Sequence, residues 1–524
     1  MINNDKINKI LEKHKDDKEQ LDFITSTEQS LTIAPAGYGK TEMLISKLNY
    51  IIENKQIKYP KRILVLTLSN VAKHTIESRL NNNQIIDIYN FHNLASRILR
   101  LQGKQYLNID YKYEYEHNNL EDEIKDKYKK IIDKINIEFP NIQLNHKNMQ
   151  KYINNINTQK KIYYEDVICF AIVLLNNFNI NEIYKNLYSY IFVDECQDIN
   201  LLHFILLRSI ANNEYNKIFF LGDTFQSIMK FADALGEQIE DLLKKYFNMT
   251  KIIELQKNYR LEGRENISNF QKNIRNYDKK LQIELDEDFQ IKSFNYFEEE
   301  ISFINNQINK IISENKKAKI AILFSNQFYF NDDKILNLLF ENLIKENIEY
   351  INILKTEKEL NTIMKNVFNI ATNIKILNYN NLLKKIQNYY DNDISKLIEG
   401  YRNYCLKFGI DFNTIIEVLK EKDLIKYAPY CSVNVNILNI HKAKGAEWDY
   451  VFIPFLNKKQ FIYKKNCNKC NNICYNHIID INEEFYQAFY VAITRTKYGL
   501  YITSTKNNHS CLFYHSLKLI NNNY

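Results

Sequence analysis

Residues 31–41 read Leu-Thr-Ile-Ala-Pro-Ala-Gly-Tyr-Gly-Lys-Thr, the segment from which the fold is most readily predicted. A short apolar strand, Ser30–Ala34, leads into a loop that contains two glycines and ends in Gly-Lys-Thr. Beyond Thr41, leucine and isoleucine recur on one stripe, which predicts an amphipathic helix. A strand, a glycine-containing loop and a helix form the context of a phosphate-binding P-loop, so we expect an α/β fold.

The P-loop pattern predicts a nucleoside triphosphate site. Backbone N–H groups and the helix N-terminus bind phosphates, Lys40 would reach the β- and γ-phosphates, and Thr41 would ligate Mg²⁺. The candidate nucleotide-binding residues are Ala34, Pro35, Ala36, Gly37, Tyr38, Gly39, Lys40 and Thr41. The strict pattern has glycine at position 34, and the alternative interpretation is a tight turn between a strand and a helix.

An acidic pair follows a second apolar strand. Residues 191–198 read Ile-Phe-Val-Asp-Glu-Cys-Gln-Asp, so the pair lies at the strand's carboxyl end, where α/β folds bind ligands. We expect Asp194 to hold Mg²⁺ and Glu195 to orient and deprotonate the attacking water. The alternative is a solvated strand end without a catalytic role.

Composition sets broad limits on the function. A chain of 524 residues predicts about three or four domains. The net charge is +7, so a nucleic-acid surface would be a local groove. The longest apolar run, near Cys169–Leu175, is too short to span a bilayer, and the N-terminus lacks a signal-peptide core. Eight cysteines do not make a disulfide framework. We expect a cytoplasmic protein with reduced thiols and no membrane contact.

Further motifs follow in the second half of the chain. After the strand Ile218–Leu221 comes Gly-Asp-Thr-Phe-Gln-Ser-Ile, in which Gln226 could sense the γ-phosphate. Residues 490–495 read Tyr-Val-Ala-Ile-Thr-Arg, and Arg495 could reach that phosphate from another part of the fold. An arginine that arrives from a second domain can couple hydrolysis to domain motion, which suggests a motor.

The motifs taken together resemble the UvrD/Rep/PcrA family of superfamily 1 DNA helicases. The segments that carry the resemblance are Gln20, Thr67-Leu68-Ser69-Asn70, Asn90-Phe91-His92, Asp194-Glu195-Cys196-Gln197-Asp198, Gly222-Asp223 with Gln226-Ser227-Ile228, Asn258-Tyr259-Arg260, His441-Lys442-Ala443-Lys444-Gly445 with Glu447, and Tyr490-Val491-Ala492 with Thr494-Arg495. They keep the family's order and extend over nearly the whole chain.

The resemblance implies an α/β fold of two RecA-like P-loop domains with mainly helical insertion domains. Residues 1–100 and 186–275 would form the first RecA-like domain, and residues 276–340 and 430–515 the second. The insertions would be residues 101–185 and the reduced segment 341–429.

The resemblance also implies roles for single residues. Arg260 and Arg495 would act as arginine fingers, Tyr259 would stack on adenine, Gln20 would read its edge, and Glu447 would bind ATP. Lys40, Glu195, Gln226, Arg260 and Arg495 would then be the catalytic set. The residues expected at DNA are Thr67, Asn70, Phe91, His92, Phe231, His441, Lys444 and Trp448.

Two functions from different classes are consistent with these motifs. One is an ATP-dependent translocase or helicase that moves 3′ to 5′ on single-stranded DNA. The other is a DNA-responsive ATPase subunit that gates a partner nuclease, since both insertions are short and several DNA-stacking positions are altered. The compact form is similar to the UvrD-like helicase subunit of the Gabija anti-phage system. The DNA could be single-stranded or a tailed duplex.

A cysteine-rich loop stands outside the family pattern. It contains Cys467, Cys470, Cys474 and His477, which could bind one structural Zn²⁺ as a Cys₃His set. The alternatives are a reduced loop without metal and, less favoured by the spacing, an iron–sulfur cluster.

Overall fold

A computed structural model gives the fold of most of the chain. It describes residues 4–68, 70–80, 83–109, 114–116, 153–154, 157–158, 161–228, 234–276, 281–325, 333–355, 357–387, 392–420, 423–457, 483–506, 509–510, 512–513 and 516–517. Two compact units make up the structure. The first contains Met1–Pro35 and Lys40–Lys257, and the second contains Ala36–Gly39 and Asn258–Tyr524.

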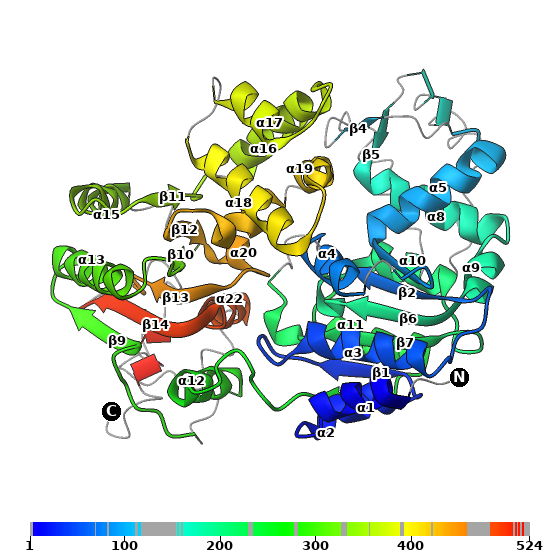
Figure 1. Cartoon of the computed structure of the whole chain (residues 1–524), viewed down its shortest axis with the longest axis horizontal. Coiled ribbons are helices and arrows are strands. Elements are labelled where there is room, and N and C mark those ends of the chain that lie inside the picture. Colours follow the sequence, from blue (N-terminus) through cyan, green and yellow to red (C-terminus); the bar gives the residue numbers. More distant parts are fainter. Residues whose placement is uncertain are drawn as a thin grey trace, which may run out of the picture. The chain divides into compact units, whose positions relative to one another are not determined.

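The first unit is built on a six-stranded sheet in the order β3-β2-β6-β7-β1-β8, in which every pairing is parallel. Its strands are β1 (Ser30–Ile33), β2 (Arg62–Thr67), β3 (Ile86–Asn90), β6 (Tyr188–Asp194), β7 (Lys217–Gly222) and β8 (Lys251–Glu254). Figure 1 shows β2, β6, β7 and β1 side by side. A separate parallel pair joins β4 (Glu114–Glu116) to β5 (Lys161–Tyr163).

Apolar side chains on both faces of this sheet explain why its strands read as continuous hydrophobic runs. On β6, Ile191 and Val193 lie in the main core of the unit, whereas Phe192 stacks on Phe219 with ring centroids 5.0 Å apart. Phe219 in turn meets the edge of Phe23 at 5.8 Å. Burial on both faces leaves the strand ends as the places where polar groups can gather.

Helices cover the sheet of the first unit. They are α1 (Asn4–Lys13), α2 (Lys18–Thr25), α3 (Lys40–Glu53), α4 (Asn70–Arg79), α5 (Phe91–Leu107), α8 (Tyr164–Asn177), α9 (Asn181–Leu187), α10 (Leu201–Ile210) and α11 (Gln238–Phe247), with short 3₁₀ turns η1 (Cys196–Asp198) and η2 (Thr224–Gln226). Among the described residues no single helix is long and apolar enough to cross a membrane. The two helical segments Asp166–Asn176 and Asn181–Leu187, which meet at a bend, have together the length and apolar composition of a membrane span. Their apolar residues are largely in the core of this unit.

The second unit has its own six-stranded sheet, ordered β11-β12-β10-β13-β14-β9 and also wholly parallel. Its strands are β9 (Phe289–Phe294), β10 (Ile320–Phe324), β11 (Tyr350–Asn352), β12 (Val435–Asn439), β13 (Trp448–Ile453) and β14 (Thr496–Thr505). One core cluster packs Ile320 and Ile322 of β10 against Ile304 and Ile308 of α13.

Helices of the second unit fall around this sheet and in the segment before β12. They are α12 (Glu265–Arg275), α13 (Phe297–Glu314), α15 (Asp333–Lys345), α16 (Glu357–Thr372), α17 (Tyr379–Ile386), α18 (Asn392–Phe408), α19 (Ile415–Lys420), α20 (Ile440–Ala443) and α22 (Glu483–Ile493), with 3₁₀ turns η4 (Phe412–Thr414) and η5 (Leu424–Tyr430). Tyr401 and Tyr404 of α18 pack edge-on against Tyr427 of η5 at 4.8 and 4.9 Å.

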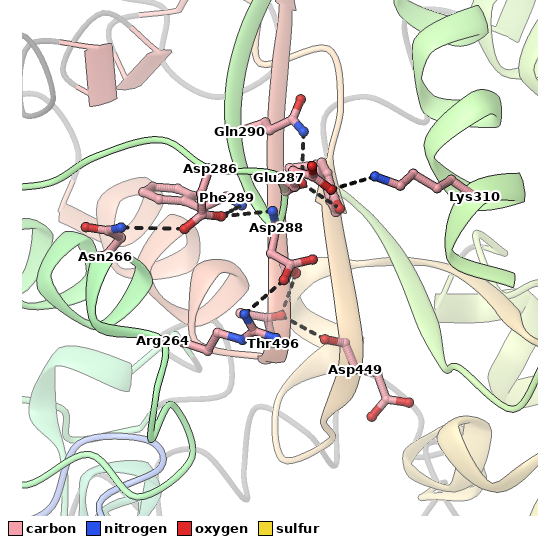
Figure 2. Close-up of polar contacts among 12 residues, drawn as sticks. Arg264, Asn266, Asp286, Glu287, Asp288, Phe289, Gln290, Lys310, Asp449 and Thr496 are labelled. Atoms are coloured by element: carbon pink, nitrogen blue, oxygen red, sulfur yellow. Dashed lines mark hydrogen bonds and ion pairs between the residues drawn. The ribbon is translucent and has the colours of Figure 1, made fainter. Parts of the chain in front are cut away.

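A polar turn fixes the amino end of β9 to two helices (Figure 2). Asp288 lies 3.0 Å from Arg264, which precedes α12, and Glu287 lies 2.7 Å from Lys310 of α13. Asp286 accepts a hydrogen bond from the Asp288 N–H at 2.9 Å, so the turn is also closed on itself. The acidic side chains here are therefore engaged in structural contacts.

The predicted fold class is confirmed: the chain is α/β, with two parallel sheets and a mainly helical segment between α16 and η5. Four cysteines of the described residues, Cys169, Cys196, Cys405 and Cys431, are free and buried. The domain boundaries inferred from the sequence stay a prediction.

Candidate functional site

The predicted phosphate loop lies between β1 and α3. Gly37 and Gly39 adopt φ values of +87° and +79°, a backbone region that glycine enters without steric cost. The N–H of Ala34 donates to the Gly222 carbonyl at 2.8 Å, which fixes the start of the loop beside the end of β7. The methyl group of Ala34 is buried, so the missing glycine at this position is accommodated by packing.

Lys40 lies among the acids at the end of β6. Its Nζ is 2.9 Å from Asp194 Oδ1 and 2.5 Å from Glu195 Oε1. Burial alone would lower the pKa of Lys40, but the two carboxylates raise it above its usual value. The ammonium group therefore stays charged and is held at the carboxyl end of the sheet.

Glu195 has an unusual backbone. Its φ of +56° puts a non-glycine residue in the left-handed region, a strained conformation that clusters at functional sites. Gln197 supports the side chain, since its Nε2 donates to Glu195 Oε2 at 2.7 Å and to Asp198 at 3.2 Å. A Cβ on Gly222 would lie 2.4 Å from Gln197 Oε1, so glycine is needed there for the two strand ends to approach.

Gln226 joins the same polar network. Its Nε2 donates to Asp223 Oδ2 at 2.7 Å, and the Asp223 N–H donates to Gln197 Oε1 at 3.0 Å. Contacts therefore run from Gln226 through Asp223 and Gln197 to Glu195. Gln197 and Asp223 were not among the predicted site residues, although both lie inside the quoted motifs. Their role depends on contacts between strands that a linear pattern does not show.

Gln20 is buried, 1% exposed, in the first turn of α2. His14 Nδ1 lies 2.5 Å from its Oε1, and His14 Nε2 lies 2.8 Å from Ser46 Oγ on α3. Burial lowers the pKa of His14. The Nδ1 donates in the contact with Gln20, because an amide oxygen only accepts. The sequence did not reveal this link between Gln20 and α3.

The donor set fits Mg²⁺ with a nucleotide. Thr41 is half-buried in the first turn of α3, and Asp194 is the last residue of β6. A hydroxyl and a carboxylate are the hard oxygen ligands that Mg²⁺ prefers. The cysteine-rich loop with Cys467, Cys470, Cys474 and His477 lies outside the described residues, and the described part of the chain holds no cluster of three His, Cys, Asp or Glu ligands.

The second unit contains a cluster of cations around one carboxylate. Arg260 Nη2 lies 2.5 Å from Glu447 Oε1, and Arg260 Nη1 donates to the Thr494 carbonyl at 2.5 Å. Lys497 Nζ is 3.4 Å from the other oxygen of Glu447. Burial alone would raise the pKa of Glu447, but Arg260, Lys497 and Arg495 lower it to about 2. The carboxylate is therefore ionised at any pH the protein meets.

The backbone at Tyr259 and Arg260 is fixed by the Gly37 loop. The Gly37 carbonyl accepts from the Tyr259 N–H at 2.9 Å and the Arg260 N–H at 3.2 Å. A Cβ at Gly37 would lie 2.7 Å from both Arg260 Cβ and Asn258 Oδ1. Tyr259 is 36% exposed.

Arg495 is buried at the start of β14. Its Nε donates to the Val491 carbonyl at 3.0 Å, and its Nη2 donates to Thr494 Oγ1 at 2.9 Å. Only 4% of the residue is exposed. The guanidinium thus lies against the end of α22, close enough to Glu447 to affect its pKa.

The residues predicted to contact DNA are placed unevenly. Thr67, Asn70, Phe91 and Trp448 are buried, whereas His92, His441 and Lys444 are half-buried and Phe231 lies outside the described residues. Phe91 packs on His203 at 4.6 Å, and Trp448 Nε1 donates to Asn436 at 2.7 Å. Both rings are core residues in this structure, so stacking on bases would require them to become exposed.

Two family models match the chain. The model described as the UvrD/REP helicase N-terminal domain matches residues 16–141 and 114–247. The model described as the UvrD-like helicase C-terminal domain matches residues 333–507. Together the two matches include the phosphate loop, the acidic pair, Glu447 and Arg495.

Similar proteins agree with this assignment. A protein of Mycoplasma capricolum described as "Probable DNA helicase II homolog" is 26% identical over 93% of this chain and 83% of its own length. The ATP-dependent DNA helicase Rep of Buchnera aphidicola is 28% identical over 74% of this chain and 67% of its own. The ATP-dependent DNA helicase PcrA of Staphylococcus epidermidis is 27% identical over 46% and 37%. With both family models and the site geometry, these relatives establish that the chain belongs to the UvrD/Rep family of DNA helicases.

Proposed function

We propose that this chain is an ATP-dependent DNA translocase or helicase that moves 3′ to 5′ along single-stranded DNA. The observation that supports it best is the cluster of Lys40 with Asp194 and Glu195, two acids beside the lysine of the phosphate loop. A P-loop lysine, a metal-binding acid and a catalytic base at adjoining strand ends are what phosphoryl transfer to water needs.

We assign the hydrolytic roles of the first unit as follows. Lys40 exchanges its carboxylate partners for the β- and γ-phosphates. Thr41 and Asp194 hold Mg²⁺, which neutralises phosphate charge when bound. Glu195 accepts the proton of the attacking water, and Gln197 holds its carboxylate in place. Gln226 contacts the γ-phosphate, and its hydrogen bond to Asp223 connects that contact to Gln197 and Glu195.

The cations of the second unit are assigned to the transition state. Arg260 and Arg495 place positive charge on the transferring phosphoryl group, where charge builds up during hydrolysis. Tyr259 offers its exposed ring to adenine. The ordered loop contact between Gly37 and residues 259–260 supports this assignment, because it holds Tyr259 and Arg260 beside a glycine of the phosphate loop.

DNA is the proposed track, and phosphate contacts should dominate its binding. Affinity should therefore fall as salt is added, because bound cations are released from the DNA on association. Fluorescence anisotropy with a labelled single strand at several salt concentrations measures this. Binding that does not change with salt would contradict a phosphate-based track.

The polarity is tested with tailed duplexes. The purified chain with ATP should separate a duplex that carries a 3′ single-stranded tail and leave one with a 5′ tail intact. A preference for the 5′ tail would overturn the proposed direction while leaving the ATPase assignment untouched.

A second candidate is a DNA-responsive ATPase that gates a partner nuclease and unwinds little on its own. The alignment with the Mycoplasma capricolum relative extends over 615 residues, more than the 524 of this chain, so the relative has stretches that this chain lacks. Loss of such segments could remove contacts with duplex DNA. Robust unwinding of a 3′-tailed duplex by the chain alone would exclude this candidate, whereas ATP turnover without strand separation would favour it.

A further inference from the structure

We propose that Glu447 is a positioning residue that holds the guanidinium of Arg260 ready for the transferring phosphate. The family resemblance gives Glu447 a different task, direct contact with ATP. Its carboxylate in this structure contacts two cations of its own unit. The inference rests on the proposed function, since it concerns how the ATPase site keeps its arginine in place.

The guanidinium of Arg260 is fixed from two sides. Glu447, in the loop between α20 and β13, binds Nη2 at 2.5 Å, and the carbonyl of Thr494, just after α22, accepts from Nη1 at 2.5 Å. Two separate elements thus define the plane of the group. A guanidinium carries five N–H donors, so it can keep both contacts and still donate to a phosphate oxygen.

The main chain of Arg260 is fixed as well. Its N–H donates to the Gly37 carbonyl at 3.2 Å and to Asn258 Oδ1 at 3.1 Å. Asn258 is tied in turn to Gln271 of α12 at 3.4 Å, and Gln271 donates to the Ile493 carbonyl at 2.7 Å. The backbone and the side chain of Arg260 are therefore both linked by hydrogen bonds to the carboxyl end of α22, which restricts rotation of the arginine.

The cluster around Glu447 has an excess of positive charge, which favours binding of an anion. Arg260, Arg495 and Lys497 surround the single carboxylate of Glu447, and Lys497 lies 3.4 Å from its second oxygen. One negative charge among three positive ones orients the arginine without cancelling the field of the cluster. An arginine held in advance costs no reorganisation when charge develops on the phosphate, which is how preorganised groups accelerate reactions.

The test is a double-substitution cycle measured as steady-state ATP turnover with single-stranded DNA. Glu447→Gln should lower kcat about tenfold without raising KM for ATP, because the loss falls on the transition state and not on substrate binding. Arg260→Ala should lower kcat further. The combined variant Arg260→Ala/Glu447→Gln should be no slower than Arg260→Ala, because Glu447 acts through that arginine.

A second readout separates positioning of Arg260 from direct contact of Glu447 with ATP, which the loss of the nucleotide's 3′-hydroxyl would reveal if that hydroxyl were the group contacted. The ratio of kcat/KM for ATP to that for 3′-deoxyATP should be the same in Glu447→Gln and in the parent. A changed ratio, a raised KM with unchanged kcat, or effects of the two substitutions that multiply would each overturn the proposal.

Controls separate this inference from the function on which it rests. Glu262→Gln alters an exposed carboxylate two residues after Arg260 and should leave kcat unchanged. Glu447→Asp should recover part of the lost rate, since it restores the charge at a shorter reach. The inference alone would be overturned if Lys40→Ala abolished ATP turnover while the effects of the Arg260 and Glu447 substitutions multiplied. No ATP turnover in the parent chain would overturn both.

Discussion

The two parallel sheets each gather charge around a cation, but with opposite balance. In the first unit one lysine, Lys40, meets two carboxylates, and further acids lie in the same network. In the second unit one carboxylate, Glu447, meets several cations. The first cluster suits a metal ion and an attacking water, whereas the second suits a phosphate anion. In the proposed function the two clusters therefore have different tasks.

The way each cation is held also differs. Lys40 is a flexible ammonium that depends on Asp194 and Glu195, which have work of their own in the proposed mechanism. Arg260 is a planar group held by a carboxylate and a carbonyl that take no direct part in the proposed chemical step. The comparison predicts that the first cluster tolerates change least, since each of its members serves more than one purpose.

The largest effect is expected at Lys40 and Glu195. Both Lys40→Ala and Glu195→Gln should reduce ATP turnover to background, because one removes the phosphate ligand and the other the base. Only Glu195→Gln should still bind ATP, since Lys40 and Thr41 remain. Nucleotide binding and turnover are measured separately. Turnover at the parent rate in Glu195→Gln would contradict the assigned base.

The next largest effect is expected at Arg495. Arg495→Ala should lower kcat about a thousandfold, the lower range for an arginine finger, with a modest change in ATP affinity. Single-turnover kinetics with DNA present measure the chemical step. Lys497→Ala, which removes a cation from the same cluster, serves as the matched control and should have a much smaller effect.

A smaller effect on turnover, with a loss of stability, is expected at Gly222. A methyl group there meets Gln197 Oε1 at 2.4 Å and Cys196 Sγ at 2.7 Å, so Gly222→Ala must displace the support of Glu195. We expect a loss of about 1–3 kcal/mol in the free energy of unfolding, typical of overpacking, and slower turnover. Gly263→Ala serves as the comparison. An added Cβ at Gly263 meets nothing within 4 Å, so this variant tests the cost of a positive φ without overpacking.

The smallest effect is expected for the pH dependence of stability, through Glu300 of the second unit. Buried Glu300 accepts from the Phe455 N–H at 2.7 Å and from Thr503 Oγ1 at 2.6 Å, and burial raises its pKa to about 7. Because the folded state binds this proton more tightly than the unfolded chain, Glu300 should lower stability as pH rises from about 4.5 to about 7. Glu300→Gln should flatten that decline in thermal unfolding. An unchanged pH profile would show that Glu300 does not titrate in this range.

Local pattern around the phosphate loop was enough to predict an α/β fold, whereas the pair of RecA-like domains was implied by the family resemblance. The strands at residues 30–34 and 191–193 are continuous apolar runs, and their polar ends follow directly in the chain. The left-handed backbone of Glu195 and the contact between Gln197 and Gly222 were not predictable in this way. They depend on how closely β6 and β7 approach, a property of packing between segments distant in sequence.

The aromatic residues show the limit of motif transfer most clearly. Phe91 and Trp448 occupy positions that the family resemblance assigns to DNA, yet both are buried in this structure. A motif gives the residue type at each sequence position, but it does not show whether that side chain is buried or exposed. For Glu447 the motif implied contact with ATP, which stays a prediction, and the structure adds a contact with Arg260 that the motif did not indicate.

The proposed function can be tested by steady-state ATP turnover of the purified chain with Mg²⁺, with and without single-stranded DNA. The two charge clusters and the family assignment predict hydrolysis that single-stranded DNA stimulates strongly and that Lys40→Ala abolishes in either condition. Turnover that DNA leaves unchanged, or that survives Lys40→Ala, would contradict a DNA motor driven from this site.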